Sequence, residues 1–317
     1  MREFGGYLGF EHYTGREYHE NAIALNSGRN CLRYLIRAKQ IKSIAVPRYI
    51  CSAVTDVCLE EKVEIQYYDI DWQFKPSLRG AAEGMSVYVV NYFGQLEPDY
   101  LEAVCTRYSH VIIDNSQDFY AKALPGADTL YTCRKFFGVC DGAYLYTDRK
   151  LDTELVRESA YSRMGFLLGR YECGANAFYG AYQDNEKFLA GQDIRYMSCL
   201  TQNIMKSLDY DRIGERRTQN YGMLADAFGE NNRLSLSVPN APYMYPLLID
   251  GGGHTRSELN RRKIYTPLLW PNVLETVDEN DPAFYLAKNI LPLPCDQRYS
   301  AEDMADMIEE IRPLIQK

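Results

Sequence analysis

The 317-residue sequence lacks the features that mark membrane, secreted and nucleic-acid-binding proteins. It contains no run of about eighteen apolar residues, so we predict no membrane-spanning helix. The first residues, MREFGGYLGFEHY, lack the basic flank and apolar core of a secretory signal peptide. Lysine and arginine total 35 against 43 acidic residues, and the net charge of −8 argues against a nucleic-acid or anionic-membrane surface. These absences predict a cytoplasmic protein.

Metal-binding and nucleotide-binding signatures are also missing. The nine cysteines form no C-x-x-C pair and the four histidines have no ligand spacing, so we expect reduced, buried cysteines and no metal site. The sequence contains no H-E-x-x-H, no G-x-x-x-x-G-K-[ST] and no G-x-G-x-x-G. These gaps disfavour a metalloenzyme, a P-loop enzyme and a dinucleotide-binding Rossmann enzyme.

In the first half of the chain, short β-rich apolar segments alternate with helical patterns. The predicted strands are residues 43–50, 63–71, 86–94, 110–115 and 142–147, with helices between them such as 51–62 and 98–108. Strands separated by helices imply right-handed βαβ units and a mostly parallel sheet that is covered on both faces. Ligands of such sheets bind at the carboxyl ends of the strands.

The second half predicts a smaller unit. Residues 151–192 are aromatic and contain glycines without clear periodicity, which favours a connecting region, and residues 194–228 predict a long helix. The last helix is predicted to start at a Ser300-x-x-Asp303 cap. We therefore expect a large α/β domain over residues 1–200 and a small α+β domain over residues 201–317.

A helix is predicted to begin near Gly28, in LNSGRNCLRYLIRA. The start of a helix exposes free backbone N–H groups, and Gly28 allows a ligand to approach them, which suits a phosphate. The alternative is an ordinary helix cap followed by a solvated arginine face.

A carboxylate and a lysine follow at the predicted ligand edge. Asp114 ends the apolar strand of HVIIDNSQDFYA, with Gln117 three residues later, and this carboxylate either binds a ligand or closes a turn. Lys135 lies 21 residues after Asp114 in YTCRKFFGVCDGAY, with Thr132 three residues before it and an Asp-Gly turn after it. The alternative for such a lysine is a snorkelling surface residue.

The order of these features is the one that a pyridoxal phosphate site requires. An aspartate holds the pyridine nitrogen protonated, a helix start and a hydroxyl hold the phosphate, and a lysine forms an imine with the aldehyde. The sequence therefore predicts pyridoxal 5'-phosphate as the cofactor.

At these segments the chain resembles the DegT/DnrJ/StrS family, the sugar-nucleotide aminotransferases among the fold-type I pyridoxal phosphate enzymes. The likeness extends over nearly the whole chain and includes LNSGRNCLRYLIRA, VVNYFGQLEPDYLEAV, VIIDNSQDFYA, YTCRKFFGVCDGAYLYTD and RRKIYTPLLWP. It implies a mostly parallel sheet of the seven-stranded type in the large domain. By position, Lys135 would bond to the cofactor, Asp114 would contact the pyridine nitrogen and Gln117 would lie near the 3-hydroxyl. Gly28 and Arg29 would hold the phosphate.

The chain departs from the family at several positions. The family's serine five residues before the lysine is Leu130 here, so Thr132 is expected to take its place on the phosphate. The aromatic residue that usually stacks on the cofactor ring falls at Cys51, and Tyr49 and Asn91 are the nearby candidates.

The resemblance implies an aminotransferase that moves an amino group from a glutamate-like amino acid to a keto sugar nucleotide. A lyase or dehydratase on the same fold and a non-catalytic binding protein are the alternatives. Arg298, Tyr299 and Trp270 resemble residues that border the substrate, although Trp270 also suits a core position. Residues 195–198 fall where the family supplies a segment to a neighbouring subunit, so a homodimer with shared active sites is expected.

Overall fold

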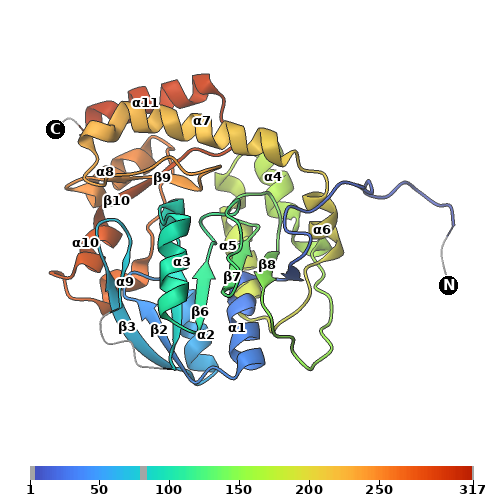
Figure 1. Ribbon diagram of the computed structural model, residues 1–317. Helices are drawn as coiled ribbons and strands as arrows, with labels where there is room; N and C mark the ends of the chain where they lie inside the picture. Colours follow the sequence, from blue (N-terminus) through green and yellow to red (C-terminus); the bar gives the residue numbers. More distant parts are fainter. Residues whose placement is uncertain (1–3, 79–83, 316–317) are drawn as a thin grey trace.

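The computed structural model describes residues 4–78 and 84–315 (Figure 1). The strands are β1 (Ile23–Leu25), β2 (Ser43–Pro47), β3 (Glu64–Ile70), β4 (Pro76–Ser77), β5 (Ser86–Val90), β6 (Val111–Asp114), β7 (Asp128–Thr132), β8 (Ala143–Tyr146), β9 (Met244–Leu248) and β10 (Ile290–Pro294). The α-helices are α1 (Gly28–Lys39), α2 (Ser52–Glu60), α3 (Pro98–Arg107), α4 (Gly165–Cys173), α5 (Tyr179–Ala190), α6 (Cys199–Met205), α7 (Tyr210–Phe228), α8 (Gly252–Arg261), α9 (Pro271–Thr276), α10 (Pro282–Asn289) and α11 (Ala301–Ile315). Short 3-10 turns occupy Tyr92–Gly94, Tyr161–Arg163, Asn176–Phe178 and Gly229–Asn231.

One sheet dominates the structure, with the strand order β1-β8-β7-β6-β5-β2-β3-β4. Strands β3, β2, β5, β6 and β7 run parallel to one another. Strand β8 runs antiparallel to both β7 and β1, and the two-residue β4 is an antiparallel edge beside β3. The predicted mostly parallel α/β sheet is confirmed, with β4 as a short addition to the seven-stranded type.

The two faces of the sheet are covered by different helices. Along β5 and β6, Val89 and Ile113 belong to the apolar cluster under α3, whereas Tyr88 and Ile112 belong to the cluster under α1. Successive side chains of a strand point to opposite faces, so Asp114, two residues after Ile112, also points to the face that α1 covers. This alternation places a carboxylate at the end of an otherwise apolar face.

The chain after α6 builds a second, smaller layer. Strands β9 and β10 pair antiparallel over five residues each, and α7, α8 and α11 pack around them. In Figure 1, α7 and α11 lie side by side above β9. Helix α11 begins at the predicted cap, where Ser300 Oγ donates to Asp303 at 2.8 Å and accepts from the Asp303 amide at 3.1 Å. The boundary at residue 200 remains a prediction.

Two predictions of secondary structure were wrong. Residues 151–192 contain α4 and α5 instead of only a connecting region, because most of the aromatic side chains of these helices lie in solvent and break the one-sided apolar spacing. Tyr171, for example, is 92% exposed. The predicted helix over 194–228 is interrupted. Residues 195–198 pair with β1, and α6 and α7 follow as two separate helices.

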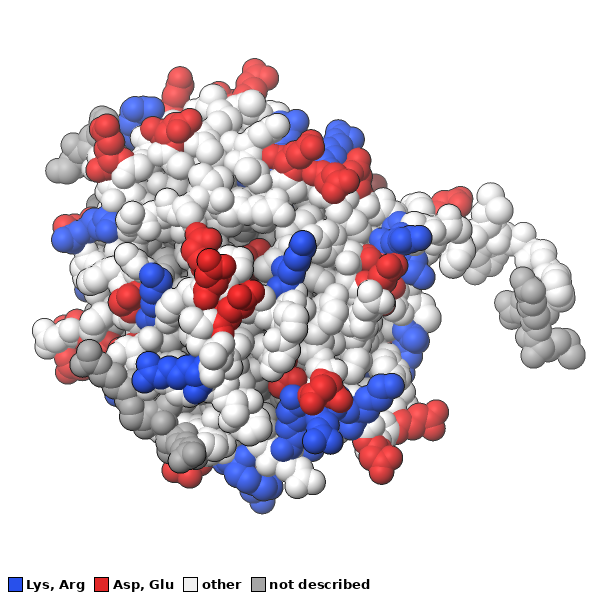
Figure 2. All heavy atoms as spheres, viewed as in Figure 1, with Lys and Arg blue, Asp and Glu red and all other residues white. Residues whose placement is uncertain are grey.

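The surface carries charges of both signs. Figure 2 shows acidic and basic side chains interspersed over the face drawn. No helix within residues 4–78 and 84–315 is long and apolar enough to cross a membrane.

Candidate active site

The candidate site lies where the carboxyl ends of β5, β6 and β7 meet the first turn of α1. The register places Asp114 of β6 beside Val90, the last residue of β5, and beside Leu130 of β7, which continues for two more residues to Thr132. A Cβ atom on Gly28 would lie 2.7 Å from the Thr132 side chain, which shows how closely α1 approaches the end of β7. The fold therefore brings together segments separated by about a hundred residues of sequence.

Asp114 is held by a donor on each carboxylate oxygen. The side chain is buried, with 7% of its surface exposed. Its Oδ1 accepts from the Ser116 backbone N–H at 2.8 Å, and its Oδ2 accepts from the Tyr88 hydroxyl at 2.8 Å. Together these two hydrogen bonds fix the orientation of the carboxylate.

Lys135 points to the same place from the loop after β7. Its half-buried Nζ donates to Ser116 Oγ at 2.9 Å and lies 5.6 Å from the centre of the Tyr243 ring. Burial lowers the pKa of Lys135, although the nearby charge of Asp114 opposes this change. The lysine is therefore enclosed beside a carboxylate without pairing to it directly.

Ser116 links these two residues and was missed by the sequence analysis. Its N–H donates to Asp114, its hydroxyl accepts from Lys135, and its carbonyl accepts from Thr132 Oγ1 at 3.4 Å. The only signal in the sequence is its position two residues after the strand-end aspartate. A serine in a loop is common, so this position alone did not indicate a link.

The loop that carries Lys135 is closed by the predicted Asp141-Gly142 turn. Gly142 has a φ of 116°, and a Cβ there would lie 3.0 Å from the Cys133 sulfur. Both the backbone conformation and the lack of space for a side chain therefore require glycine. Asp141 is fully buried and accepts from the amide and hydroxyl of Ser198 at 2.8 and 2.7 Å. The turn thereby ties the lysine loop to the segment before α6.

The first turn of α1 provides free donors at the same edge. Ser27 caps the helix by accepting from the Asn30 amide at 3.3 Å. Among the residues that the structure describes, the amides of Gly28 and Arg29 have no protein acceptor. Burial and the neighbouring charge of Arg29 lower the pKa of Arg134, which pairs with Glu186 of α5. The free amides of Gly28 and Arg29 at the start of the helix suit an anion.

Gln117 and Asn91 hold the loops around the site. Gln117 Oε1 accepts from the Phe93 amide at 2.8 Å, and Asn91 Oδ1 accepts from the Leu96 amide at 3.0 Å. Asn91 also donates to Asp118 at 3.1 Å. Burial raises the pKa of Asp118 to about 7, which this hydrogen bond opposes. Both predicted residues thus lie at the carboxyl edge and fix the loops that follow β5 and β6.

The candidates for stacking on a cofactor ring differ in position. Cys51 is half-buried just before α2, and its electrostatic effect on Lys135 opposes the lowering of the lysine's pKa by burial. Tyr49 is fully enclosed, with its ring 5.4 Å from Tyr92 and 4.7 Å from Trp270. Tyr49 and Trp270 therefore pack as part of the core, whereas Cys51 is near enough to Lys135 to influence its pKa.

The segment with Arg298 and Tyr299 also approaches the lysine loop. Its neighbour Gln297 donates to the carbonyl of Phe136, the residue after Lys135, at 2.8 Å. Arg298 is exposed and forms two hydrogen bonds with Asp296, at 2.6 and 2.8 Å. The structure thus brings this segment to the rim of the site.

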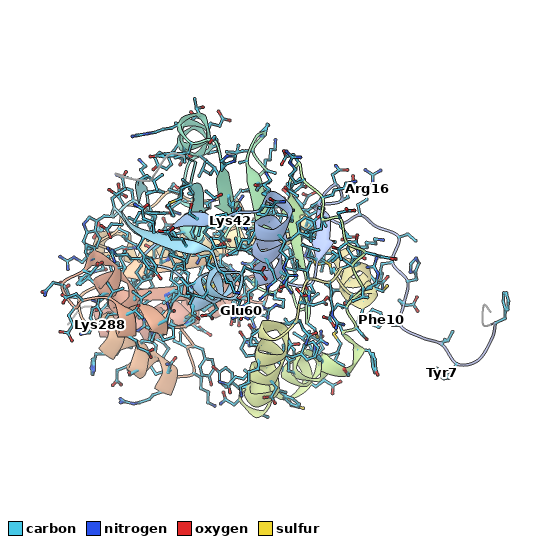
Figure 3. The ribbon with its side chains drawn as sticks, turned by 90° about the horizontal axis from the view of Figure 1, so that it is seen from below. Tyr7, Phe10, Arg16, Lys42, Glu60 and Lys288 are labelled. Atoms are coloured by element: carbon cyan, nitrogen blue, oxygen red, sulfur yellow. The ribbon has the colours of Figure 1, made fainter. Side chains whose placement is uncertain are left out.

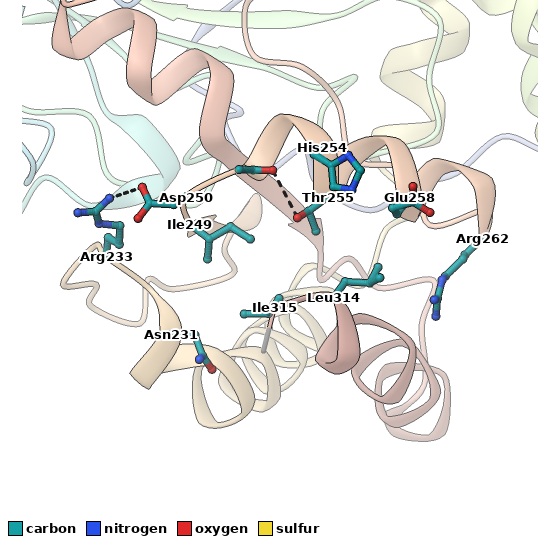
Figure 4. Close-up of a pocket in the computed structure, with 11 residues that line it drawn as sticks. Asn231, Arg233, Ile249, Asp250, His254, Thr255, Glu258, Arg262, Leu314 and Ile315 are labelled. Carbon is teal, nitrogen blue, oxygen red and sulfur yellow. Dashed lines mark hydrogen bonds and ion pairs between the residues drawn. The ribbon is translucent and has the colours of Figure 1, made fainter. Parts of the chain in front are cut away.

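Other features do not compete with this site. No group of three or more metal-ligating side chains occurs in the described parts of the chain. A hollow between the end of β9, α8 and the end of α11 (Figure 4) has no residue of the candidate site in its lining. Its Arg233 and Arg262 pair with Asp250 and Glu310.

Comparisons with known proteins identify the fold. No family model matches the chain, and no curated protein matches its sequence. S. venezuelae DesV aligns over 93% of this chain and 85% of its own, with a TM-score of 0.67 and 14% identity. A DegT DnrJ EryC1 StrS aminotransferase from Brucella abortus covers 93% and 86%, with a TM-score of 0.64 and 15% identity. The sugar aminotransferase CalS13 from Micromonospora echinospora covers 93% and 87%, with a TM-score of 0.65 and 15% identity.

The chain has the fold of these aminotransferases. Spr1654 from Streptococcus pneumoniae, which also aligns, is known in apo, PLP and PMP forms. The resemblance predicted from the sequence is confirmed at the level of the fold.

Proposed function

We propose that the protein is a pyridoxal phosphate-dependent aminotransferase that moves an amino group from a glutamate-like amino acid to a keto sugar nucleotide. One observation carries the proposal: the half-buried Lys135 amine is linked through Ser116 to the buried carboxylate of Asp114. The shared fold supports it, because solved proteins with this fold include sugar aminotransferases.

The residues present fit pyridoxal phosphate. The free amides of Gly28 and Arg29 supply donors for a phosphate at the start of α1. The Thr132 hydroxyl would join them by exchanging its 3.4 Å hydrogen bond to the Ser116 carbonyl for one to the phosphate. Asp114 supplies an anion for a protonated ring nitrogen, and Lys135 supplies an amine for an aldehyde. When bound, the cofactor supplies a carbonyl carbon and an electron-accepting ring.

Lys135 has a second role as the base for proton transfer. Burial lowers its pKa, so a larger fraction of the amine is neutral near neutral pH than in an exposed lysine. Its hydrogen bond to Ser116 Oγ fixes the direction of Nζ. We assign Lys135 Nζ to take the proton from the α-carbon of the amino acid, which becomes a keto carbon, and to deliver a proton to the former carbonyl carbon of the acceptor, which receives the amino group.

Arg298 and Tyr299 are proposed to line the sugar-nucleotide side of the site. Their segment reaches the lysine loop through the hydrogen bond from Gln297 to Phe136. Substituting either residue is expected to raise the Michaelis constant for the acceptor. Arg262 is a matched control, because it is also a half-exposed arginine paired with a carboxylate, 2.7 Å from Glu310. Unchanged Michaelis constants in both variants would remove this assignment.

We propose that two copies form a homodimer. Helices α4 and α5 expose Leu168, Tyr171 and Tyr179, and such an apolar patch is typical of an interface. Tyr7 and Phe10 lie on an N-terminal segment that extends from the body (Figures 1 and 3). Sedimentation velocity at micromolar concentration is expected to show a dimer, and a monomer with cofactor bound would contradict this proposal.

Spectroscopy of the purified protein with pyridoxal phosphate tests the function. We expect an absorption band near the edge of the visible range, and borohydride reduction should fix the cofactor on Lys135, as mapped by peptide mass spectrometry. Lys135→Ala should lose the band, whereas Lys39→Ala should keep it. Glutamate should convert the band to that of pyridoxamine phosphate. Binding without this conversion would favour a lyase, a dehydratase or a non-catalytic protein.

A further inference from the structure

Tyr88 of β5 donates a hydrogen bond to Asp114 in the candidate site, and the proposed function assigns Tyr88 no role. Its side chain is 2% exposed, and its hydroxyl lies 2.8 Å from Asp114 Oδ2. We propose that Tyr88 is a positioning residue that fixes the Asp114 carboxylate and stabilises its charge, so that the ring nitrogen of the cofactor stays protonated. This inference rests on the proposed function, because Tyr88 acts on the cofactor only through Asp114.

The sheet holds Tyr88 in the position that this role needs. Tyr88 pairs with Ile112 of β6 in parallel register, and both side chains share the face of Asp114. The strand itself is fixed by backbone pairing with β2 on one side and β6 on the other. The donor to Asp114 therefore comes from a rigid central strand and not from a loop.

Each of the two donors to Asp114 binds a different oxygen of the carboxylate. The Ser116 amide binds Oδ1 and the Tyr88 hydroxyl binds Oδ2, so rotation of the carboxylate would break both hydrogen bonds. Hydrogen bonds to an ionised acceptor are stronger than those between neutral groups. Loss of Tyr88 alone would leave one buried oxygen without its donor and would make the charged form less favourable.

The other titratable groups that face Asp114 do not replace this donor. They are Lys135 from the loop after β7, Cys31 from α1 and Tyr92 from the turn after β5. Burial raises the pKa of Cys31 and of Tyr92, so both remain neutral. Lys135 donates to Ser116 instead. Burial and the charge of Asp114 also raise the pKa of Tyr88, so its hydroxyl keeps its proton.

The test is the pH dependence of cofactor affinity in the full chain. Pyridoxal phosphate is titrated by absorbance between about pH 5 and 8 into wild type and Tyr88→Phe. Affinity is expected to weaken on acidification, and in Tyr88→Phe the midpoint of this loss should lie about one pH unit higher, because the buried carboxylate has lost one of its two donors. In an Asp114→Asn background, Tyr88→Phe should cause no further change.

Tyr68→Phe is the matched control, because it also removes one buried hydroxyl from the same part of the sheet without touching Asp114. It should lower stability similarly and leave the midpoint unchanged. An unchanged midpoint in Tyr88→Phe, or an equal shift in Tyr68→Phe, would overturn the proposal.

A second variant covers the case in which Tyr88→Phe does not fold. Site-specific replacement of Tyr88 by 3-fluorotyrosine keeps the shape and makes the hydroxyl a stronger donor, so the midpoint should move to lower pH. A midpoint that stays in place would overturn the proposal. Failure of the wild type to bind pyridoxal phosphate at any pH is a different result, because it rejects the proposed function and removes the basis for the role of Tyr88.

Discussion

Two lysines at opposite ends of the same sheet have opposite surroundings. Lys39, at the end of α1, lies at the amino end of β7, with Nζ 2.7 Å from both Asp128 and Asp148. Lys135 lies at the carboxyl end of β7, where Nζ donates to the Ser116 hydroxyl at 2.9 Å and forms no ion pair with any described carboxylate. One lysine has two anionic partners and the other has a neutral one.

This difference determines which form of the amine is stable. Burial opposes the charge of Lys39, but hydrogen bonds to Asp128 and Asp148 outweigh it and raise the pKa. Burial lowers the pKa of Lys135, and the charge of Asp114 offsets it only in part. The fold thus stabilises an ammonium at the amino end and makes an amine available at the carboxyl end, where ligands of such sheets bind.

Removing each lysine in turn should produce the largest contrast. Lys135→Ala is expected to abolish the covalent bond to the cofactor and to reduce transamination by about 10³-fold or more, because both the anchor and the base are lost. Lys39→Ala should retain activity and lose only stability. Steady-state rates and borohydride trapping measure the difference, and equal losses in the two variants would contradict the comparison.

Substituting the aspartate near each lysine should likewise affect turnover at the carboxyl end of the sheet and not at the amino end. Asp114→Asn removes the anion from the ring nitrogen and should reduce turnover by about 10²- to 10³-fold with little change in melting temperature. Asp128→Asn weakens only the pairing with Lys39, so turnover should stay near that of wild type. Unchanged turnover in Asp114→Asn would make the strand-end carboxylate a turn residue.

His19 tests whether burial alone neutralises a base in this protein. It is 4% exposed, its Nε2 lies 2.8 Å from the Phe119 carbonyl, and burial lowers its pKa to about 4. The unfolded state takes up the proton near pH 6.5, so stability is full above that pH. It should fall by about 3 kcal/mol as the pH drops towards 4.

Chemical denaturation across this pH range measures that loss. In His19→Gln, which retains a donor for the Phe119 carbonyl, the corresponding part of the pH dependence should disappear. Because His12, His110 and His254 are exposed, they provide the background in both proteins. An identical pH dependence in the variant would show that His19 is not neutralised by burial.

Much of the sheet could be predicted because alternation and apolar runs are local properties of a strand. Asp114 and Lys135 were also accessible, since strand ends and loop residues of a parallel sheet gather at one edge. Strand β7 was missed because DTLYT has no apolar run of its own and is a strand through its pairing with β6 and β8. Helices α4 and α5 were missed because they lack a buried stripe.

The links within the site were not accessible from the sequence. Strand parity predicts that Tyr88 and Asp114 share a face, but the hydrogen bond depends on the distance between two particular strands. The role of Ser116 likewise depends on the path of a loop. Tyr49 and Trp270 pack in the core because of the way distant segments meet, which residue type alone does not determine.

The smallest expected effects are changes in stability that have opposite signs for the two lysines. Replacing each lysine by methionine keeps the length of the side chain and removes the charge. Lys39→Met should destabilise the cofactor-free protein by about 1 to 2 kcal/mol, because Asp128 is buried and loses its partner. Lys135→Met should stabilise it by about 1 kcal/mol, because the half-buried amine has only a neutral partner, and sites used for function often reduce stability. Urea denaturation of the two cofactor-free variants measures both changes, and a loss of stability in Lys135→Met would show that the serine contact compensates fully for burying the amine.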